Sequence, residues 1–179
     1  MKQKHPTWIR VRVSSNTEFV RMRRLVNTNH LHTVCESASC PNIGECWGRG
    51  TATFMILGNH CTRNCRFCDV PPDQPNELDN EEPRRVAEAV HLLALKHAVI
   101  TSVTRDDLPD GGAQIWAETV RQIRALNPAC RIEVLIPDFQ GDKTSLRTVL
   151  QAHPDILGHN IETVPRLYPL ARPQADYRR

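Results

Sequence analysis

The sequence of 179 residues lacks any apolar run that approaches the length needed to cross a membrane. Its first ten residues, MKQKHPTWIR, show neither an apolar stretch nor the arginine- and serine-rich pattern of a targeting peptide, so we expect no leader. Aromatic residues are scarce, and near the N-terminus only Trp8 and Phe19 interleave with basic residues. Without a recognition motif beside them, nucleic acid is a disfavoured partner. These absences predict a cytoplasmic globular protein that binds neither membrane nor nucleic acid.

The composition fits a chain with one hydrophobic core, because 40% of the residues are hydrophobic and 24% are charged. The charge is uneven: residues 1–24 contain seven basic residues and one acid, although the whole chain carries only +3. This basic arm favours either an acidic partner surface or simple solvation, and the sequence leaves both open. Seven cysteines in a protein without an export signal indicate metal or redox chemistry more than disulfides.

Three cysteines stand close together at Cys61, Cys65 and Cys68, with the spacing C-x3-C-x2-C. Three thiolates in one short loop can hold a four-iron cluster and leave its fourth iron without a protein ligand. The neighbouring Arg63 and Arg66 are expected to lower the free energy needed to gather anionic sulfurs. A zinc site is the main alternative, because Cys65 and Cys68 also have the spacing of a zinc knuckle.

A second triplet, Cys35, Cys40 and Cys46, lies upstream with the spacing C-x4-C-x5-C. The two triplets are fifteen residues apart, and their gaps do not match paired zinc knuckles. The seventh cysteine, Cys130, has no cysteine neighbour and is interpreted as a small buried residue at the start of a strand.

Apolar patterns after residue 50 predict alternating strands and helices. The expected strands cover residues 51–58, 98–104, 131–136 and 155–162, and the expected helices cover residues 82–97, 114–126, 144–153 and 164–179. In the first helix Pro83 occupies the first turn, and His97 falls on the apolar face. Strands joined by single helices predict an α/β fold with a parallel sheet.

The unusual residues follow the predicted strands. The three-cysteine loop follows the first strand, residues 105–112 the second, residues 138–143 the third, and residues 159–162 close the fourth. Ligands bind at the carboxyl ends of parallel strands, so we expect these four loops to form one site. The segment 105–112 suits a tight loop that presents acids at the sheet edge, although a purely structural turn remains an alternative.

The spacing of Cys61, Cys65 and Cys68 resembles the signature of the radical S-adenosylmethionine (SAM) superfamily. Its pairing with the upstream triplet closely resembles the lipoyl synthase family, and the segments PTWIRVRV, TATFMILG, SVTRDDLPDGG and HNIETVPRLY agree with that family. The resemblance implies a partial parallel (β/α) barrel with about four of six βα units in residues 51–179. It also implies an N-terminal extension, residues 1–50, that carries an auxiliary cluster motif.

The resemblance further implies two [4Fe–4S] clusters and SAM as cofactors. The cluster on Cys61, Cys65 and Cys68 would generate a radical that abstracts hydrogen from carbons six and eight of an octanoyl chain on a lipoyl carrier domain. The cluster on the upstream triplet would be sacrificed as the sulfur source, and a ferredoxin or flavodoxin would donate electrons.

The same resemblance assigns the remaining contacts to the SAM molecule. The position after the second strand, with Arg105 and Asp106, approaches the amino group of SAM in the superfamily. Asn160 and Glu162 would reach its ribose hydroxyls, or would simply be solvated at a strand end.

The family also carries a further C-terminal stretch with a serine that caps the upstream cluster, whereas this sequence ends at Arg179. The sequence is therefore expected to be a fragment with lower activity and stability than a longer family member. One alternative is an inactive remnant that binds an iron–sulfur cluster without turnover. A third is another radical sulfurtransferase similar to biotin synthase, which the upstream triplet disfavours.

Overall fold

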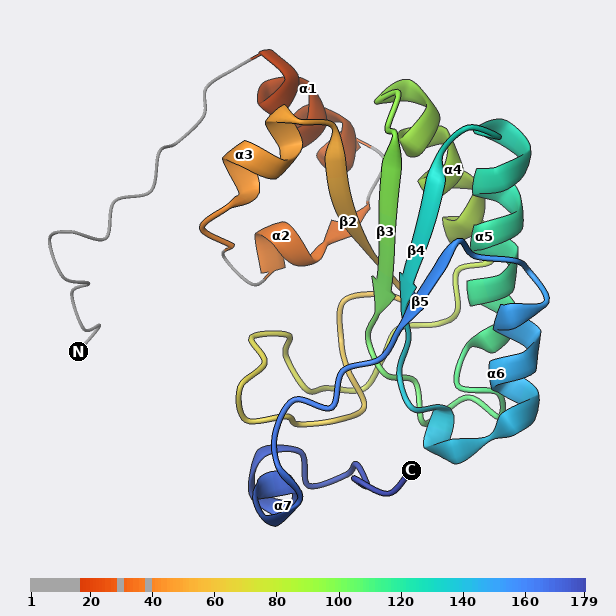
Figure 1. The fold of residues 1–179 in the computed structure, drawn as a ribbon. Helices are drawn as coiled ribbons and strands as arrows, with labels where there is room; N and C mark the ends of the chain where they lie inside the picture. The colour runs from red at the N-terminus through yellow and green to blue at the C-terminus, as the bar shows by residue number, and fades with distance from the viewer. Residues whose placement is uncertain (1–16, 29–30, 38–39) are drawn as a thin grey trace, which may run out of the picture.

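The structure is a computed structural model that describes residues 17–28, 31–37 and 40–179 (Figure 1). The segment PTWIRVRV and most of the predicted basic arm lie outside the described residues. The helices are α1 (Thr17–Thr28), α2 (Val34–Ser37), α3 (Ile43–Gly48), α4 (Glu82–Leu92), α5 (Ala113–Leu126), α6 (Lys143–Leu150) and α7 (Tyr168–Ala171), with 3-10 turns at Phe139–Gly141 and Pro165–Leu167. The strands are β1 (His32–Thr33), β2 (Thr51–Ile56), β3 (His97–Ser102), β4 (Arg131–Leu135) and β5 (Ile156–Gly158).

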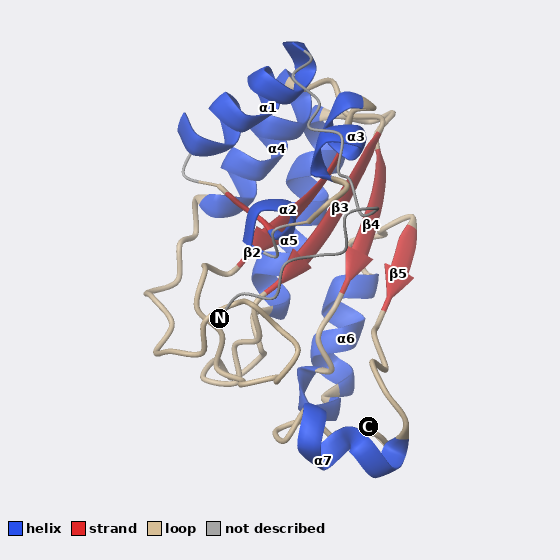
Figure 2. Ribbon diagram, turned by 90° about the vertical axis from the view of Figure 1, so that its left-hand side faces the viewer, coloured by secondary structure: helices blue, strands red, loops and turns tan. Residues whose placement is uncertain are grey.

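Within the described residues the strands form one five-stranded sheet in the order β1-β2-β3-β4-β5. Strands β2 to β5 are parallel, while β1 pairs antiparallel with β2 and places His32 opposite Met55. Helices α4, α5 and α6 connect the parallel strands and lie on one side of the sheet (Figure 1), and β5 lies at its edge (Figure 2). The predicted α/β fold with a parallel sheet is confirmed. Strand β1 was not predicted, because two residues are too few to show an alternating pattern.

The two faces of the sheet have different environments because successive side chains of a strand point to opposite faces. Phe54, Ile100 and Val134 are paired in register on neighbouring strands and are fully buried in the hydrophobic core. Each is followed by a residue of the opposite face, and that second row, Met55, Thr101 and Leu135, lines a cavity. One face of the sheet is therefore packed, while the other faces a cavity, as in the interior of an open barrel.

Two predicted boundaries are wrong because the backbone turns into the left-handed region. Strand β2 ends at Ile56 instead of continuing to residue 58, since Leu57 and Gly58 have φ values of 69° and 94°. Helix α4 ends at Leu92 instead of residue 97, and Ala94 has a φ of 48°. His97 already belongs to β3, so its predicted place on the helix face is wrong. The other central strands and helices differ from their predicted bounds by at most three residues.

The C-terminal predictions need a larger correction. Strand β5 covers only Ile156–Gly158 instead of residues 155–162, and Glu162 has a φ of 70°. The predicted helix over residues 164–179 is also wrong, because only a 3-10 turn and the four-residue α7 form there. Pro173 explains this early end, since proline disfavours the helical conformation of the residue before it and supplies no N–H. None of the described helices is long and apolar enough to span a membrane.

Candidate functional site

The segment after β2, residues 57–73, forms a closed loop that carries three thiols, and we call it the cysteine loop. The N–H of Cys61 donates to the carbonyl of Pro71 at 3.1 Å, and the N–H of Asp73 donates to the carbonyl of Cys61 at 3.2 Å. A further backbone hydrogen bond joins Cys68 to Cys65 at 3.1 Å. These bonds fold the loop back on itself and hold the three cysteines on a short arc.

All three cysteines line one cavity of about 290 Å³ at the carboxyl ends of the parallel strands. Its apolar walls come from the open face of the sheet and the residues that follow it, including Met55, Val103, Leu135 and Ile136. His159, Asn160, Glu162 and Arg172 line the same cavity. The structure thus brings the cysteine loop together with Asn160 and Glu162, two of the residues predicted to contact SAM.

Hydrogen-bond donors approach two of the three sulfurs. Cys61 Sγ accepts the backbone N–H groups of Arg63 at 3.4 Å and Thr104 at 3.3 Å. Burial raises the pKa of Cys65, while the guanidinium of Arg172, which hydrogen-bonds to this side chain, acts in the opposite direction. The donors and the cation thus partly offset the effect of burial, and they favour the thiolate, which is the metal-binding form.

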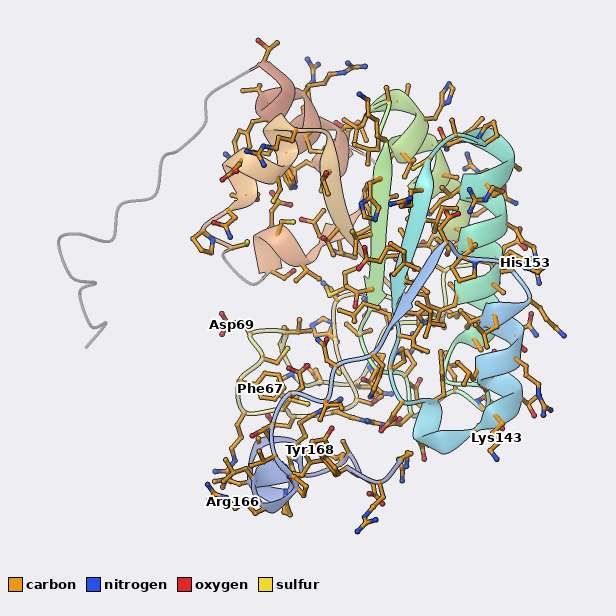
Figure 3. All side chains as sticks on the ribbon, in the orientation of Figure 1. Phe67, Asp69, Lys143, His153, Arg166 and Tyr168 are labelled. Atoms are coloured by element: carbon orange, nitrogen blue, oxygen red, sulfur yellow. The ribbon has the colours of Figure 1, made fainter. Side chains whose placement is uncertain are left out.

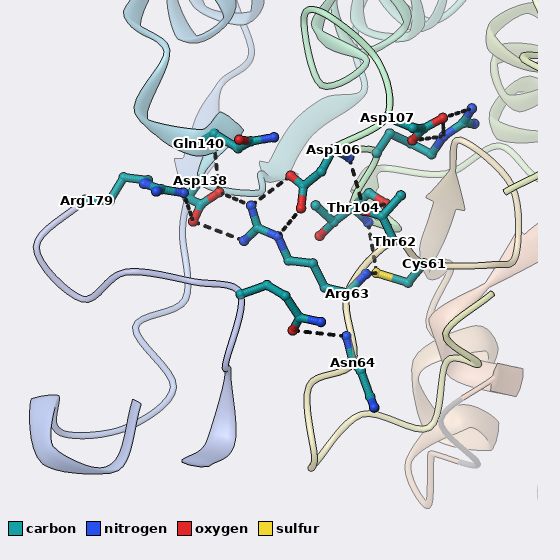
Figure 4. Close-up of polar contacts among 12 residues, drawn as sticks. Cys61, Thr62, Arg63, Asn64, Thr104, Asp106, Asp107, Asp138, Gln140 and Arg179 are labelled. Atoms are coloured by element: carbon teal, nitrogen blue, oxygen red, sulfur yellow. Dashed lines mark hydrogen bonds and ion pairs between the residues drawn. The ribbon is translucent and has the colours of Figure 1, made fainter. Parts of the chain in front are cut away.

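The prediction that Arg63 favours the thiolates through its charge is wrong. Its guanidinium is only 2% exposed and binds the carboxylates of Asp106 and Asp138, away from the sulfurs (Figure 4). Burial alone would lower the pKa of Arg63, but hydrogen bonds from these two carboxylates outweigh burial and raise it. Arg172 is the cation that acts on Cys65, and sequence reasoning missed it because no local pattern relates it to the cysteines.

The C-terminal segment that carries Arg172 packs against the cysteine loop. The N–H of Arg66 donates to the carbonyl of Ala171 at 3.0 Å, and the N–H of Asn64 donates to Gln174 Oε1 at 3.3 Å. Figure 3 shows Phe67 of the loop on the same side of the molecule as Tyr168 of α7. This packing explains how a residue distant in the sequence reaches Cys65.

Arg105 and Asp106 lie apart from the cysteine cavity. The buried guanidinium of Arg105 binds the Asp107 carboxylate at 2.9 Å and the carbonyl of Leu57 at 3.3 Å, whereas Asp106 binds Arg63. Both line a separate hollow of about 260 Å³ between the loops that follow β3 and β4. The structure therefore does not bring them together with Asn160 and Glu162.

The upstream cysteines also lie near one another. Cys35 is in α2, Cys46 is in α3, and the N–H of Cys40 donates to the carbonyl of Cys35 at 3.0 Å. Burial raises the pKa of Cys46, and the nearby Cys35 and Cys40 raise it further, while Arg49 opposes them. The three cysteines of the second triplet thus lie close together in space, on two short helices and the segment between them.

The described thiols are not arranged as one zinc ion would require. At a Zn–S distance of about 2.3 Å, tetrahedral geometry requires sulfurs within about 4 Å of one another. Among the residues that the structure describes, no three His, Cys, Asp or Glu side chains are placed to hold a single metal ion. A four-iron cluster instead binds each thiolate at a different iron, which allows wider spacing.

A family model described as the radical SAM superfamily matches residues 55–179, from β2 to the end of the chain. The match covers more than half of the sequence and includes the whole cysteine loop. This chain belongs to the radical SAM superfamily. Membership implies that the cysteine loop holds a [4Fe–4S] cluster and that SAM binds beside it.

Curated relatives extend the similarity to the N-terminal part of the chain. A lipoyl synthase from Rubrobacter xylanophilus is 58% identical over 174 residues, which cover 97% of this chain and 54% of the relative. Lipoyl synthases from Pelodictyon phaeoclathratiforme and Caldicellulosiruptor saccharolyticus are 56% and 52% identical, over 60% and 63% of their lengths and 97% and 100% of this chain. The chain therefore spans somewhat more than half the length of these relatives.

Proposed function

We propose that this chain carries out the chemistry of a lipoyl synthase, the insertion of two sulfur atoms at carbons six and eight of an octanoyl group on a lipoyl carrier domain. The observation that supports it most is that two separate cysteine triplets are each gathered in space, one of them at a cavity. A single cluster site would fit many radical SAM enzymes. The 52–58% identity to lipoyl synthases favours this particular reaction.

In this proposal Cys61, Cys65 and Cys68 hold one [4Fe–4S] cluster as thiolates. The cluster and SAM supply one-electron chemistry that removes hydrogen from unactivated carbon. The backbone N–H groups at Cys61 and the guanidinium of Arg172 stabilise the sulfur charge. Apolar walls such as Met55 and Leu135 exclude water and give an alkyl chain a suitable surface.

We assign Asn160 and Glu162 to the ribose hydroxyls of SAM, because both line the cysteine cavity. Arg105 and Asp106 act on the cofactor site through their contacts with Leu57 and Arg63. We propose this indirect role instead of the predicted direct contact with the amino group of SAM, because it agrees better with where Arg105 and Asp106 lie.

The second triplet, Cys35, Cys40 and Cys46, holds the auxiliary [4Fe–4S] cluster, which is the source of the inserted sulfur. Residues 1–50 thus form the extension that carries the auxiliary cluster, and residues 51–179 form the SAM-binding barrel part. The proposed partners are octanoylated carrier domains and an electron donor such as ferredoxin or flavodoxin.

The test is anaerobic reconstitution with iron and sulfide, followed by turnover of an octanoyl-lysine peptide. Two clusters predict about eight irons per chain, and about four in either Cys40→Ala or Cys65→Ala. Cys65→Ala should abolish both SAM cleavage and lipoyl formation, whereas Cys40→Ala should abolish only lipoyl formation. Cys130→Ala is the matched control, because Cys130 is buried away from both triplets, and it should keep both activities.

Other results would contradict the proposal. Stoichiometric zinc without iron would favour the zinc site, and equal loss of SAM cleavage in both variants would contradict the division of labour between the clusters. Iron-loaded protein that does not cleave SAM would support the alternative of a non-catalytic iron–sulfur protein.

A further inference from the structure

The side chain of Arg63 lies at the junction of three loops. Its Nε and Nη2 donate to the two Asp106 carboxylate oxygens at 2.6 and 2.9 Å. Its Nη1 and Nη2 donate to the two Asp138 oxygens at 3.0 and 2.7 Å (Figure 4). One guanidinium therefore binds both carboxylates in a bidentate manner, and joins the cysteine loop after β2 to the loops after β3 and β4.

The same junction contains a second set of bonds between the first two loops. The N–H and hydroxyl of Thr62 both donate to the carbonyl of Thr104, at 3.1 and 2.9 Å, and the Asp106 N–H donates back to Thr62 Oγ1 at 3.1 Å. Thr104 also donates its N–H to Cys61 Sγ. These bonds thus fix the backbone around Thr62, and with it the position of the Cys61 thiol.

Burial makes the arginine network sensitive to small changes. The side chains of Arg63 and Asp138 are only 2% and 5% exposed. Removing Arg63 would leave the buried Asp138 with the longer ion pair to Arg179, at 3.7 Å, and the Gln140 N–H. Most of its charge compensation would then be lost away from water, which is unfavourable. Lysine cannot reproduce the network, because its ammonium lacks the planar fork that binds two oxygens of each carboxylate.

We propose that Arg63 is a positioning residue that holds the cysteine loop in its ligand-binding shape before any cluster is bound. This inference rests on the proposed function only in that the loop is taken to bind a cluster. Arg63 does not touch the sulfurs with its side chain, and its carboxylate partners lie outside the cysteine cavity. Its effect on cluster binding comes from reducing the conformational freedom of the loop between Cys61 and Cys65.

The test compares Arg63→Gln, Arg63→Lys and Asp106→Asn with the unchanged chain. Arg124→Gln is the control, because Arg124 forms another bond between elements, to Asp155 at 2.6 Å, without contact to the cysteine loop. Hydrogen exchange of the cluster-free protein, followed by peptide mass spectrometry, measures the opening of residues 61–68. The rate of cluster formation with iron and sulfide is measured on the same samples.

We expect Arg63→Gln to speed exchange in residues 61–68 by about tenfold or more, with little change in β3 and β4. Cluster formation should slow in parallel, Arg63→Lys should show a smaller effect in the same direction, and Arg124→Gln should show none. If Arg63→Gln does not fold, Asp106→Asn takes its place, because it keeps the arginine and one full carboxylate partner. It should show the same faster exchange in residues 61–68 and the same slower cluster formation.

Two results would overturn the proposal. The first is unchanged exchange in residues 61–68, and the second is faster exchange spread evenly over the core strands, which would show a general role in stability. The exchange measurement needs no cluster, so it decides this question even if the unchanged chain fails to bind iron. That failure would count against the proposed function alone.

Discussion

Replacing Gly112 with alanine should destabilise the protein through contact with the start of the cysteine loop. Gly112 precedes α5 with a φ of +86°, and a Cβ at this position would lie 2.5 Å from Leu57 Cδ1. The Leu57 side chain has little free space to turn into, because it is only 3% exposed, and both sides of its backbone are held as well. Its N–H donates to Glu82 at 2.7 Å, and its carbonyl accepts from Arg105 at 3.3 Å.

The destabilisation has two contributions, the left-handed backbone and the contact with Leu57, and a comparison with Gly50 separates them. It has a similar φ of +73°, but nothing lies within 4 Å of the Cβ that alanine would add. The left-handed backbone alone costs about 1–2 kcal/mol for alanine, which is the effect expected at Gly50. Forcing extra volume into packed surroundings adds about 1–3 kcal/mol at Gly112. The stabilising effect of alanine through the unfolded chain applies equally to both variants and cancels in their comparison.

Thermal unfolding of the cluster-free protein, followed by circular dichroism, measures the difference. Each kcal/mol shifts the melting temperature of a chain of this size by about 2–4 °C, so an extra cost of about 1–3 kcal/mol should make Gly112→Ala melt about 2–12 °C below Gly50→Ala. In a double-mutant cycle, Leu57→Ala should recover part of the loss, because it removes the atom that the new Cβ meets. Equal melting temperatures for the two glycine variants would refute the reasoning.

Three further predictions follow from other residues. Burial raises the pKa of Glu82, so the stability that its protonated form contributes is present below about pH 4.5 and is lost as the pH rises through the folded-state pKa. Glu82→Gln lacks this loss, so its free energy of unfolding should increase relative to that of the unchanged chain over the same rise in pH. Urea unfolding measures both free energies, and parallel pH profiles for the two proteins would contradict this. Ile100→Ala should lower the free energy of unfolding by about 2–5 kcal/mol, whereas Thr101→Ala on the cavity face should cost only about 1 kcal/mol through its lost hydrogen bond; similar losses would argue against the two-faced sheet. Arg172→Gln should raise the pKa of Cys65 in the cluster-free protein, seen as alkylation of that thiol shifting to higher pH, and an unchanged profile would show that the guanidinium does not act on it.

Local patterns in the sequence were sufficient for the order of the central elements. Strands β2 to β5 and helices α4 to α6 occur where the apolar patterns place them, since burial on a sheet or helix depends on residues only a few positions apart. The boundary errors occur where tertiary contacts override these patterns. Leu57 leaves the strand conformation while Glu82 and Arg105 bind its backbone, and both partners come from other segments.

The candidate site likewise has features that the sequence determined and features that only the tertiary structure decided. The spacing of Cys61, Cys65 and Cys68 determined by itself that three thiols would share one loop, because a few intervening residues cannot carry them far apart. Only the tertiary structure decided which charges surround that loop. Arg63 is only two residues from Cys61 and yet turns to Asp106 and Asp138, while Arg172 reaches Cys65 from the C-terminal segment. Side-chain direction depends on partners that folding brings from distant parts of the chain, and sequence spacing carries no information about them.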